Sequence, residues 1–393
     1  MHLITRTDEL AEACARLGSA PFVAVDTEFM REQTFWPRLC LIQMAAEGVE
    51  VLVDSLSPEL DLEPFFRLMV DERVPKVFHS ARQDIEIVHH LARVIPHPIF
   101  DTQVAAMVCG FGEAVSYSML VKRLLNRNLD KSSRFTDWSR RPLSERQLTY
   151  ALGDVVYLRD LYPKLRAQLD RSERASWLNE EMATLTDPTT YQLHPEHAWK
   201  RLKMRVKTPK ALAVLMELAA WREREAQTQD VPRSRILKDE ALYDVASQAP
   251  QSVEDLGSLR SLHNGFARSG RGRAVLEAVA RGLERDPNTV PPIERGEPMP
   301  PEAQAVVDLL RVLLKATAGR HGVAPKLIAT SDELEVIARS GDGDVPVLRG
   351  WRRKLFGEDA LALKRGELAL VIKSGEVAVL PAAQTRGERK REA

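Results

Sequence analysis

The sequence predicts an α/β domain with a mixed β-sheet, followed by two small all-α helical bundles. Three observations support this fold class. Short apolar runs of strand length come first and then alternate with helical patterns, which indicates a mixed sheet covered by helices. Beyond about residue 200, apolar residues recur at helical spacing. That part also contains a faint repeat, because a shift of 92 residues aligns Leu218 with Leu310 and Ile236 with Ile328.

The composition of the whole chain limits the classes of protein that need considering. Its 393 residues suffice for two or three domains, each with its own core. Lys plus Arg and Asp plus Glu both number 56, so net charge favours no class of partner. The cysteines are few and lack metal-ligand spacing, and no apolar run approaches about 18 residues. The N-terminus also lacks a signal-peptide pattern, so we expect a cytoplasmic protein without a membrane segment.

The first predicted strand carries two carboxylates at its end. Residues 22–25 form a short apolar run after Pro21, and the run leads into Asp26 and Glu28. Side chains two residues apart on a strand point to the same face, so these carboxylates would project side by side. Two such charges repel unless a proton or a cation lies between them. An isolated pair of this kind is more often only a solvated strand end.

Further elements follow in a regular order. Strands are predicted at residues 38–44 and 49–54, and Gly48 marks the turn between them, which predicts a meander. A helical stretch to about Val70 and a strand at residues 76–79 come next. The helix predicted after that strand places Asp84 in its first turn.

The second half of the α/β domain ends in a long helix. Residues 99–100 are predicted as a strand, after which Asp101 can cap another helix. A polar, basic connection over residues 126–142 leads to a helix that starts at Ser144. On this helix Tyr150 and Asp154 stand four residues apart and share one face.

Four carboxylates and a phenol thus come from three separate elements. Ligand sets made only of oxygen suit Mg²⁺ or Mn²⁺ rather than zinc, and no histidine or cysteine cluster competes for a metal. Two such ions about 4 Å apart can hold the attacking and leaving oxygens of an in-line phosphoryl displacement. The five residues are Asp26, Glu28, Asp84, Tyr150 and Asp154.

These motifs resemble the DEDD superfamily of 3′–5′ exonucleases in its tyrosine subgroup, and most closely the ribonuclease D family. Residues 25–29 (VDTEF) match the first motif, residues 77–84 match the second, and residues 150–154 match Tyr-x-x-x-Asp. The histidine subgroup would have a histidine at position 149, where Thr149 stands. The stretch over residues 129–143 also resembles ribonuclease D rather than a polymerase proofreading domain.

The resemblance implies a fold, a cofactor and residue roles. It implies a ribonuclease H-like exonuclease domain over residues 1–183 that uses two divalent metal ions, Mg²⁺ or Mn²⁺. The metal ligands would be the four motif carboxylates. Since a phenol ordinarily has a pKa of about 10 and is a poor base, we expect Tyr150 to orient the attacking water. The implied ligands are Asp26, Glu28, Asp84 and Asp154.

Four more residues are candidates for substrate contacts. Phe29 and Met30 follow the first motif, where enzymes of this family often wedge the terminal base. Lys131 and Arg134 lie in the basic connection and could contact phosphate, although a solvated basic loop explains them equally well.

Beyond the α/β domain, a basic segment and the first helical bundle are predicted to hold nucleic acid, whereas the second bundle could bind RNA, bind protein or only cap the first. A linker is expected over residues 184–209, and residues 200–210 carry six positive charges and no acid next to Trp199. Such a run beside a nuclease domain favours a strip that binds a nucleic-acid backbone. The bundle at residues 210–290 contains Trp221-Arg222 and the stretch 231–240 (VPRSRILKDE), and on these residues it resembles the HRDC domain, an auxiliary nucleic-acid-binding module. A stiff linker at 291–300, a second, divergent HRDC-like bundle at 301–380 and a disordered tail at 381–393 complete the predicted organisation.

The expected function is a 3′–5′ exoribonuclease, acting as a monomer. It would release nucleoside 5′-monophosphates from the 3′ ends of structured RNA such as transfer RNA precursors. One alternative is a DNA 3′–5′ exonuclease for repair, with single-stranded DNA as partner, because the metal chemistry does not sense the 2′-hydroxyl. The other is a non-catalytic RNA-binding adaptor, against which the presence of all five site residues argues.

Overall fold

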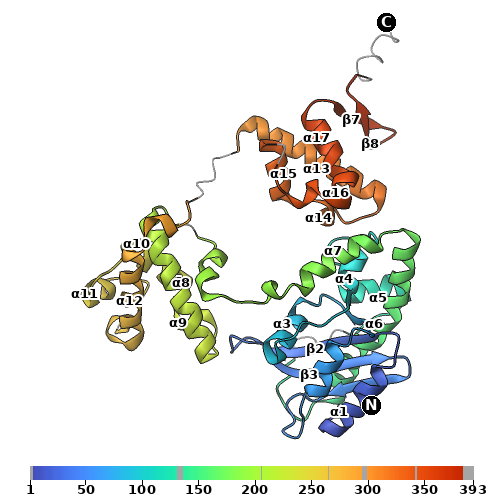
Figure 1. Cartoon of the computed structure of the whole chain (residues 1–393), viewed down its shortest axis with the longest axis horizontal. Coiled ribbons are helices and arrows are strands. Elements are labelled where there is room, and N and C mark those ends of the chain that lie inside the picture. The colour runs from blue at the N-terminus through green and yellow to red at the C-terminus, as the bar shows by residue number, and fades with distance from the viewer. Residues whose placement is uncertain are drawn as a thin grey trace.

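The chain folds into an N-terminal α/β domain and two C-terminal helical units (Figure 1). The computed structural model describes residues 3–130, 136–204, 206–263, 265–293, 299–340 and 343–383. In Figure 1 the first helical unit lies to one side of the α/β domain, and the second packs directly over α7 (Ala175–Thr186). No helix in these ranges is long and apolar enough to cross a membrane.

A six-stranded mixed sheet forms the centre of the α/β domain. Its strand order is β1 (Leu3–Ile4), β4 (Val49–Val53), β3 (Arg38–Ala46), β2 (Val23–Met30), β5 (Lys76–Phe78) and β6 (Ile99–Asp101). The central β2, β3 and β4 pair antiparallel as the predicted meander, whereas β1, β5 and β6 join in parallel. Gly48 has a φ of +70° at the β3–β4 turn, a conformation that glycine adopts without strain.

Helices cover both faces of the sheet, which explains why β3 is buried from Leu39 to Ala46. Alternate residues of β2 face opposite sides, so Val23 and Val25 join one core and Ala24 joins the other. The first core is covered by α1 (Thr7–Leu17), α2 (Glu63–Met69) and α3 (Arg82–Ala92). The second is covered by α4 (Thr102–Val108), α5 (Tyr117–Leu125), α6 (Glu145–Arg171) and α7.

Capping residues set the starts of two of these helices, as predicted. The Asp101 carboxylate accepts hydrogen bonds from the backbone amides of Gln103 (2.8 Å) and Val104 (3.3 Å) at the start of α4. Ser144 begins α6 with a reciprocal capping box that involves Gln147. The position of α6 matters for function because this helix carries Tyr150 and Asp154.

The segment expected as a linker contains ordered turns. Two short helices, η1 (Pro188–Thr190) and η2 (Pro195–Arg201), lie between α7 and the first helical unit. Tyr191 is buried there, and its hydroxyl donates to the Leu185 carbonyl at 2.7 Å. Trp199 packs against the core of the helical unit that follows.

The first three helices of one helical unit correspond to the first three of the other. The two helices of each corresponding pair begin 92 residues apart, in agreement with the sequence repeat. The first unit contains α8 (Pro209–Gln229), α9 (Arg233–Ile236), α10 (Asp239–Gln248), α11 (Val253–Gly257), η3 (Phe266–Arg268), α12 (Gly270–Glu284) and η4 (Pro287–Thr289). The second contains α13 (Pro301–His321), α14 (Pro325–Ile328), α15 (Ser331–Arg339), η5 (Pro346–Leu348), α16 (Gly350–Arg352), η6 (Arg353–Gly357) and α17 (Glu358–Lys364).

The second unit ends in a β-hairpin that was not expected in an all-α bundle. Strands β7 (Leu368–Lys373) and β8 (Glu376–Pro381) pair antiparallel around Ser374 and Gly375. Both turn residues have positive φ, +54° and +83°, which is typical of a two-residue hairpin turn. The hairpin extends to Pro381, the first residue of the predicted tail, whereas residues 384–393 lie outside the described ranges.

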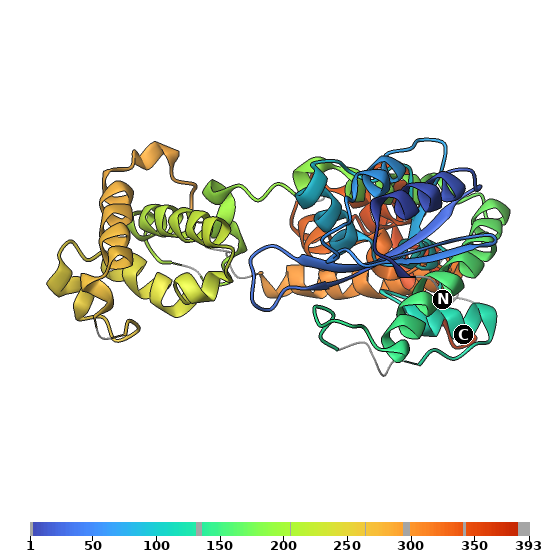
Figure 2. The same ribbon diagram turned by 90° about the horizontal axis from the view of Figure 1, so that it is seen from below.

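The β2–β3 hairpin connects the α/β domain to the first helical unit. Figures 1 and 2 show the tip of this hairpin extending from the sheet towards that unit. Phe35 at the tip is 4% exposed and packs into the core of the unit. The Asp230 carboxylate accepts hydrogen bonds from the amides of Phe35 and Trp36, both at 3.0 Å. The Arg233 guanidinium lies 4.4 Å from the centre of the Phe35 ring.

The second helical unit packs on α4 and α7. The Trp177 and Trp351 rings stack with centroids 4.2 Å apart. Arg352 forms an ion pair with Glu180 at 2.8 Å, and the Ala324 amide donates to the Met107 carbonyl at 3.0 Å.

Candidate active site

A β-bulge lies where β2 carries its carboxylates. Glu28 pairs with Leu41 of β3, but the next residue, Phe29, pairs with Leu39, so Cys40 is left as an extra residue. Bulges of this kind bend a strand and redirect its side chains, and they are common beside active sites. The extra residue belongs to β3, so the bulge bends that strand opposite Glu28 and Phe29.

Arg141 holds the bulge and the approach to α6 together. Its Nη2 donates to the Cys40 carbonyl at 2.7 Å, and it forms a two-point ion pair with Asp54 at 2.5 and 2.7 Å. It also donates to the Trp138 carbonyl at 2.7 Å. This guanidinium thus connects β3 and the residue that follows β4 to the loop that leads into α6.

Three of the predicted metal ligands converge between β2 and α6. One oxygen each from Asp26, Glu28 and Asp154 lies within 4.8 Å of the other two, and all three side chains are half-buried. This is the spacing of ligand atoms around a cation, and the oxygen-only set suits a hard divalent ion.

Asp84 completes the acidic cluster from the first turn of α3. It is 6% exposed, and its carboxylate accepts a hydrogen bond from the Thr27 hydroxyl at 2.5 Å. Burial raises the pKa of Asp84 to about 7. The pKa of Asp26 is raised well above its ordinary value by burial and then by the charges of Asp84, Asp154 and Glu28. A bound cation would relieve this repulsion, so the cluster fits a metal-binding role.

The cluster lies in a cleft of about 460 Å³. Tyr150 reaches the cleft from α6, and its ring lies 6.1 Å from that of Trp138. The structure thus brings all five predicted site residues together. Four of them line the cleft, and Glu28 joins them because a carboxylate oxygen of Glu28 lies close to those of Asp26 and Asp154. The lining includes Asp26, Thr27, Phe29, His79, Gln83, Asp84, Gln103, Ser116, Tyr117, Asp130, Tyr150, Asp154 and Leu158.

The candidates for substrate contacts have different environments. Phe29 lines the cleft. Met30 instead packs in a side cluster with Trp138, Leu148 and Tyr150. Lys131 and Arg134 lie outside the described residues.

Two residues of this site were not assigned roles from the sequence. The Tyr117 hydroxyl, on α5, donates to the backbone carbonyls of Asp154 (2.6 Å) and Gly153 (3.2 Å). Burial raises the pKa of Tyr117 well above its ordinary value, so this phenol stays a donor and supports the α6 backbone at Asp154. Tyr117 belongs to no motif, and no sequence signal identifies it. Arg141 lies within the stretch that resembles ribonuclease D, which is a usable signal.

Comparisons with known proteins agree with this geometry. A family model described as 3′-5′ exonuclease matches residues 1–170, and the HRDC domain model matches residues 211–279. The chain is 57% identical to ribonuclease D of Nitrobacter hamburgensis, over 94% of this chain and 96% of the relative. It is 48% identical to ribonuclease D of Bartonella henselae, over 94% and 91%.

Among solved structures, the chain is similar to the crystal structure of Escherichia coli RNase D, an exoribonuclease involved in structured RNA processing. The TM-score is 0.80 at 27% identity. The match covers 92% of this chain and 98% of the other, so the similarity extends over the helical units as well as the α/β domain.

Proposed function

Because the chain belongs to the ribonuclease D family of 3′–5′ exonucleases, we propose how its residues carry out the reaction of that family. The protein is a 3′–5′ exoribonuclease, and its exonuclease fold implies the use of divalent metal ions. The observation that carries the proposal is the convergence of Asp26, Glu28 and Asp154 beside Asp84.

We propose that the four carboxylates bind two divalent ions, Mg²⁺ or Mn²⁺. Their oxygens form the hard ligand set that these ions require. Burial and then repulsion from the neighbouring carboxylates raise the pKa of Asp26, and positive charge would offset that repulsion. Divalent ions bound at such a cluster acidify a water and neutralise charge on the leaving oxygen. The proposed ligands are Asp26, Glu28, Asp84 and Asp154.

Tyr150 is proposed to orient the attacking water by a hydrogen bond. Its ring is restrained by the cluster around Trp138, and α6 holds it one helical turn from Asp154. The water attacks the phosphorus of the last phosphodiester, and the bond from phosphorus to the 3′ oxygen of the preceding nucleotide breaks. That oxygen takes up a proton, and the released nucleotide keeps its phosphate on the 5′ oxygen.

Phe29 is proposed to contact the terminal base, because its side chain lines the cleft that also holds Asp26 and Asp154. The proposed substrates are 3′ ends of structured RNA, such as transfer RNA precursors with extra nucleotides. Similarity to the Escherichia coli exoribonuclease, which is involved in structured RNA processing, supports this class. The protein is proposed to act as a monomer, since a single chain supplies all the proposed site residues.

The test is digestion of single-stranded RNA labelled at its 5′ end, with Mg²⁺ and with chelator. We expect a shortening ladder that is lost in chelator and in Asp154→Asn. Tyr150→Phe should be slower by at least about tenfold, since the water loses its orienting partner. Asp170→Asn is the matched control, because Asp170 lies on the same helix in an exposed pair with Arg166.

Matched single-stranded DNA forms the second arm of this test. A ladder on DNA that exceeds the ladder on RNA would support the repair alternative. Intact RNA binding without any ladder would contradict the catalytic proposal and support the adaptor. If Tyr150→Phe were as fast as the unmodified protein, the role given to this phenol would be wrong.

A further inference from the structure

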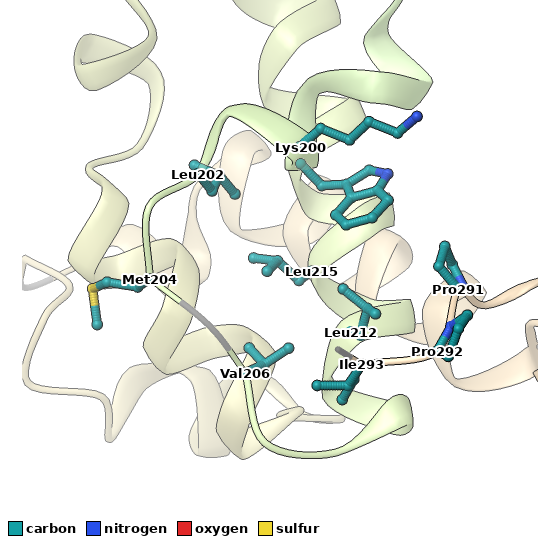
Figure 3. A pocket seen from close by; sticks show the side chains of 10 residues that line it. Lys200, Leu202, Met204, Val206, Leu212, Leu215, Pro291, Pro292 and Ile293 are labelled. Carbon is teal, nitrogen blue, oxygen red and sulfur yellow. The ribbon is translucent and has the colours of Figure 1, made fainter. Parts of the chain in front are cut away.

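A second cavity lies far along the chain from the catalytic cleft. It is a groove of about 430 Å³ beside α8, between the segment after η2 and the segment after η4. Figure 3 shows Leu215 between the Leu202–Val206 segment on one side and Pro291 and Pro292 on the other. We call it the linker groove. It is lined by Trp199, Lys200, Leu202, Met204, Val206, Leu212, Leu215, Pro291, Pro292 and Ile293.

The linker groove has an apolar floor and an aromatic wall. Leu212 and Leu215 at its base are buried, whereas Trp199 is only partly buried. Met204 at the rim is 56% exposed, so the groove is open to water. An aromatic face beside aliphatic side chains suits the flat face of a nucleobase.

The surroundings of the groove are positively charged. Lys200 lines it, and the exposed Lys203, Lys207 and Lys210 follow within ten residues. In the described part of the chain, none of these four lysines forms an ion pair. No acidic residue lines the groove. The buried Glu223 nearby in sequence is already paired with Arg201 and Arg233, both at 2.5 Å.

The wall of the groove is also held in place before any ligand binds. The Met204 amide donates to the Tyr243 hydroxyl at 2.9 Å, and Thr208 caps α8 by accepting from the Ala211 amide at 3.2 Å. A preformed wall loses little conformational freedom on binding, which favours affinity.

We propose that the linker groove binds an unpaired nucleotide of the RNA substrate. The base would lie against the Trp199 ring, and the adjoining phosphates would be neutralised by the unpaired lysines. This inference rests on the proposed function, because it takes RNA as the substrate. It adds a binding site outside the catalytic cleft and assigns it to bases upstream of the 3′ end.

The first test measures RNA binding by the full chain carrying Asp154→Asn, in chelator, so that no RNA is cleaved. The probe is a 5′-labelled oligoadenylate of about twenty nucleotides, and one of about four is compared with it. Trp199→Leu should weaken binding of the long probe by about 5-fold to 100-fold, the usual loss for one stacked base. Trp199→Phe keeps an aromatic face and should bind within about threefold of the parent.

A second variant guards against misfolding of the Trp199 variants. Met204→Glu changes an exposed side chain and puts a negative charge at the rim of the groove. This charge should repel phosphate and weaken binding of the long probe by about fivefold or more. Ile372→Glu is the matched control, because Ile372 is 82% exposed on β7. This substitution makes the same charge change outside the groove.

Each outcome of these measurements decides the inference. Weaker binding of the long probe by Trp199→Leu and Met204→Glu, with Ile372→Glu like the parent, would support it. Parent-like binding by both groove variants would overturn it. Equal losses for the long and short probes would also overturn it, because the site would then hold the 3′ end itself. Failure of the exoribonuclease assignment is seen separately, as a missing ladder with unmodified protein.

Discussion

Asp84→Asn should stabilise the metal-free protein while it abolishes metal-dependent activity. Asp84 is 6% exposed, and burial raises its pKa from 3.8 to about 7. A carboxyl whose pKa is higher in the folded state binds more protons there than in the unfolded chain. The free energy of unfolding of the metal-free protein therefore falls as the pH rises from about 4 to about 7. Asparagine removes this loss and can still accept the Thr27 hydrogen bond.

The magnitude follows from the same pKa. At 1.36 kcal/mol per pKa unit, the ionised carboxylate costs about 4 kcal/mol of stability above pH 7. Its charge favours the N-terminus of α3 by up to about 1 kcal/mol. We therefore expect a net gain of about 3 kcal/mol for Asp84→Asn at about pH 8, which is about 6 to 12 °C in the melting temperature of a domain of this size. The gain should disappear towards pH 4.

Scanning calorimetry in chelator would measure the unfolding transition of the α/β domain. Asp54→Asn is the matched control, and it should change the stability of the domain in the opposite direction. Asp54 is also buried, at 7% exposure, but it is paired with Arg141. Its loss leaves a cation without its partner and should destabilise the domain by about 3 kcal/mol. With Mg²⁺ added, only the protein that keeps Asp84 should gain stability. A melting temperature lowered by Asp84→Asn at pH 8 would refute the reasoning.

Three further predictions concern the metal site and the two helical units. Below pH 7, Mg²⁺ binding should release more protons than at pH 8, because Asp84 must lose its proton; calorimetry in buffers of different ionisation enthalpy measures this. Asp230→Gly can keep the left-handed backbone of this residue, φ +48°, but it removes the acceptor for the Phe35 and Trp36 amides. Small-angle scattering should therefore show a more extended protein. Asp230→Asn keeps an acceptor oxygen and should leave the scattering unchanged. Trp351→Ala removes the stack on Trp177 and should lower the stability of the second unit by about 3 kcal/mol, measured by denaturant unfolding; an unchanged midpoint would contradict that packing.

Local patterns predicted most of the α/β domain because they depend on neighbouring residues. The meander, the Asp101 cap and the Ser144 cap are examples, and each is confirmed by the structure. The hairpin after α17 was missed because its short strands directly follow a helical pattern.

The rest of the site depends on contacts between residues that are far apart in the sequence, and local patterns do not predict such contacts. The carboxylates of β2 follow from strand periodicity, but their meeting with Asp154 depends on the packing of α6 on the sheet. Arg141 and Asp54 are 87 positions apart, and no local pattern connects them. Tyr117 donates to the backbone carbonyls of Gly153 and Asp154, and any residue type supplies such a carbonyl, so this contact leaves no trace in the sequence.

The length of the β2–β3 hairpin relates the position of the first helical unit to that of the catalytic cleft. The strand that carries Asp26 and Glu28 continues directly into the tip that Phe35 anchors in that unit. One covalently continuous hairpin therefore spans from the site of cleavage to the unit. A folded RNA body that stops at the unit would keep a single-stranded end of constant length. Lengthening the hairpin by two residues in each strand would lengthen that end by about 7 Å of chain, without any change at the carboxylates.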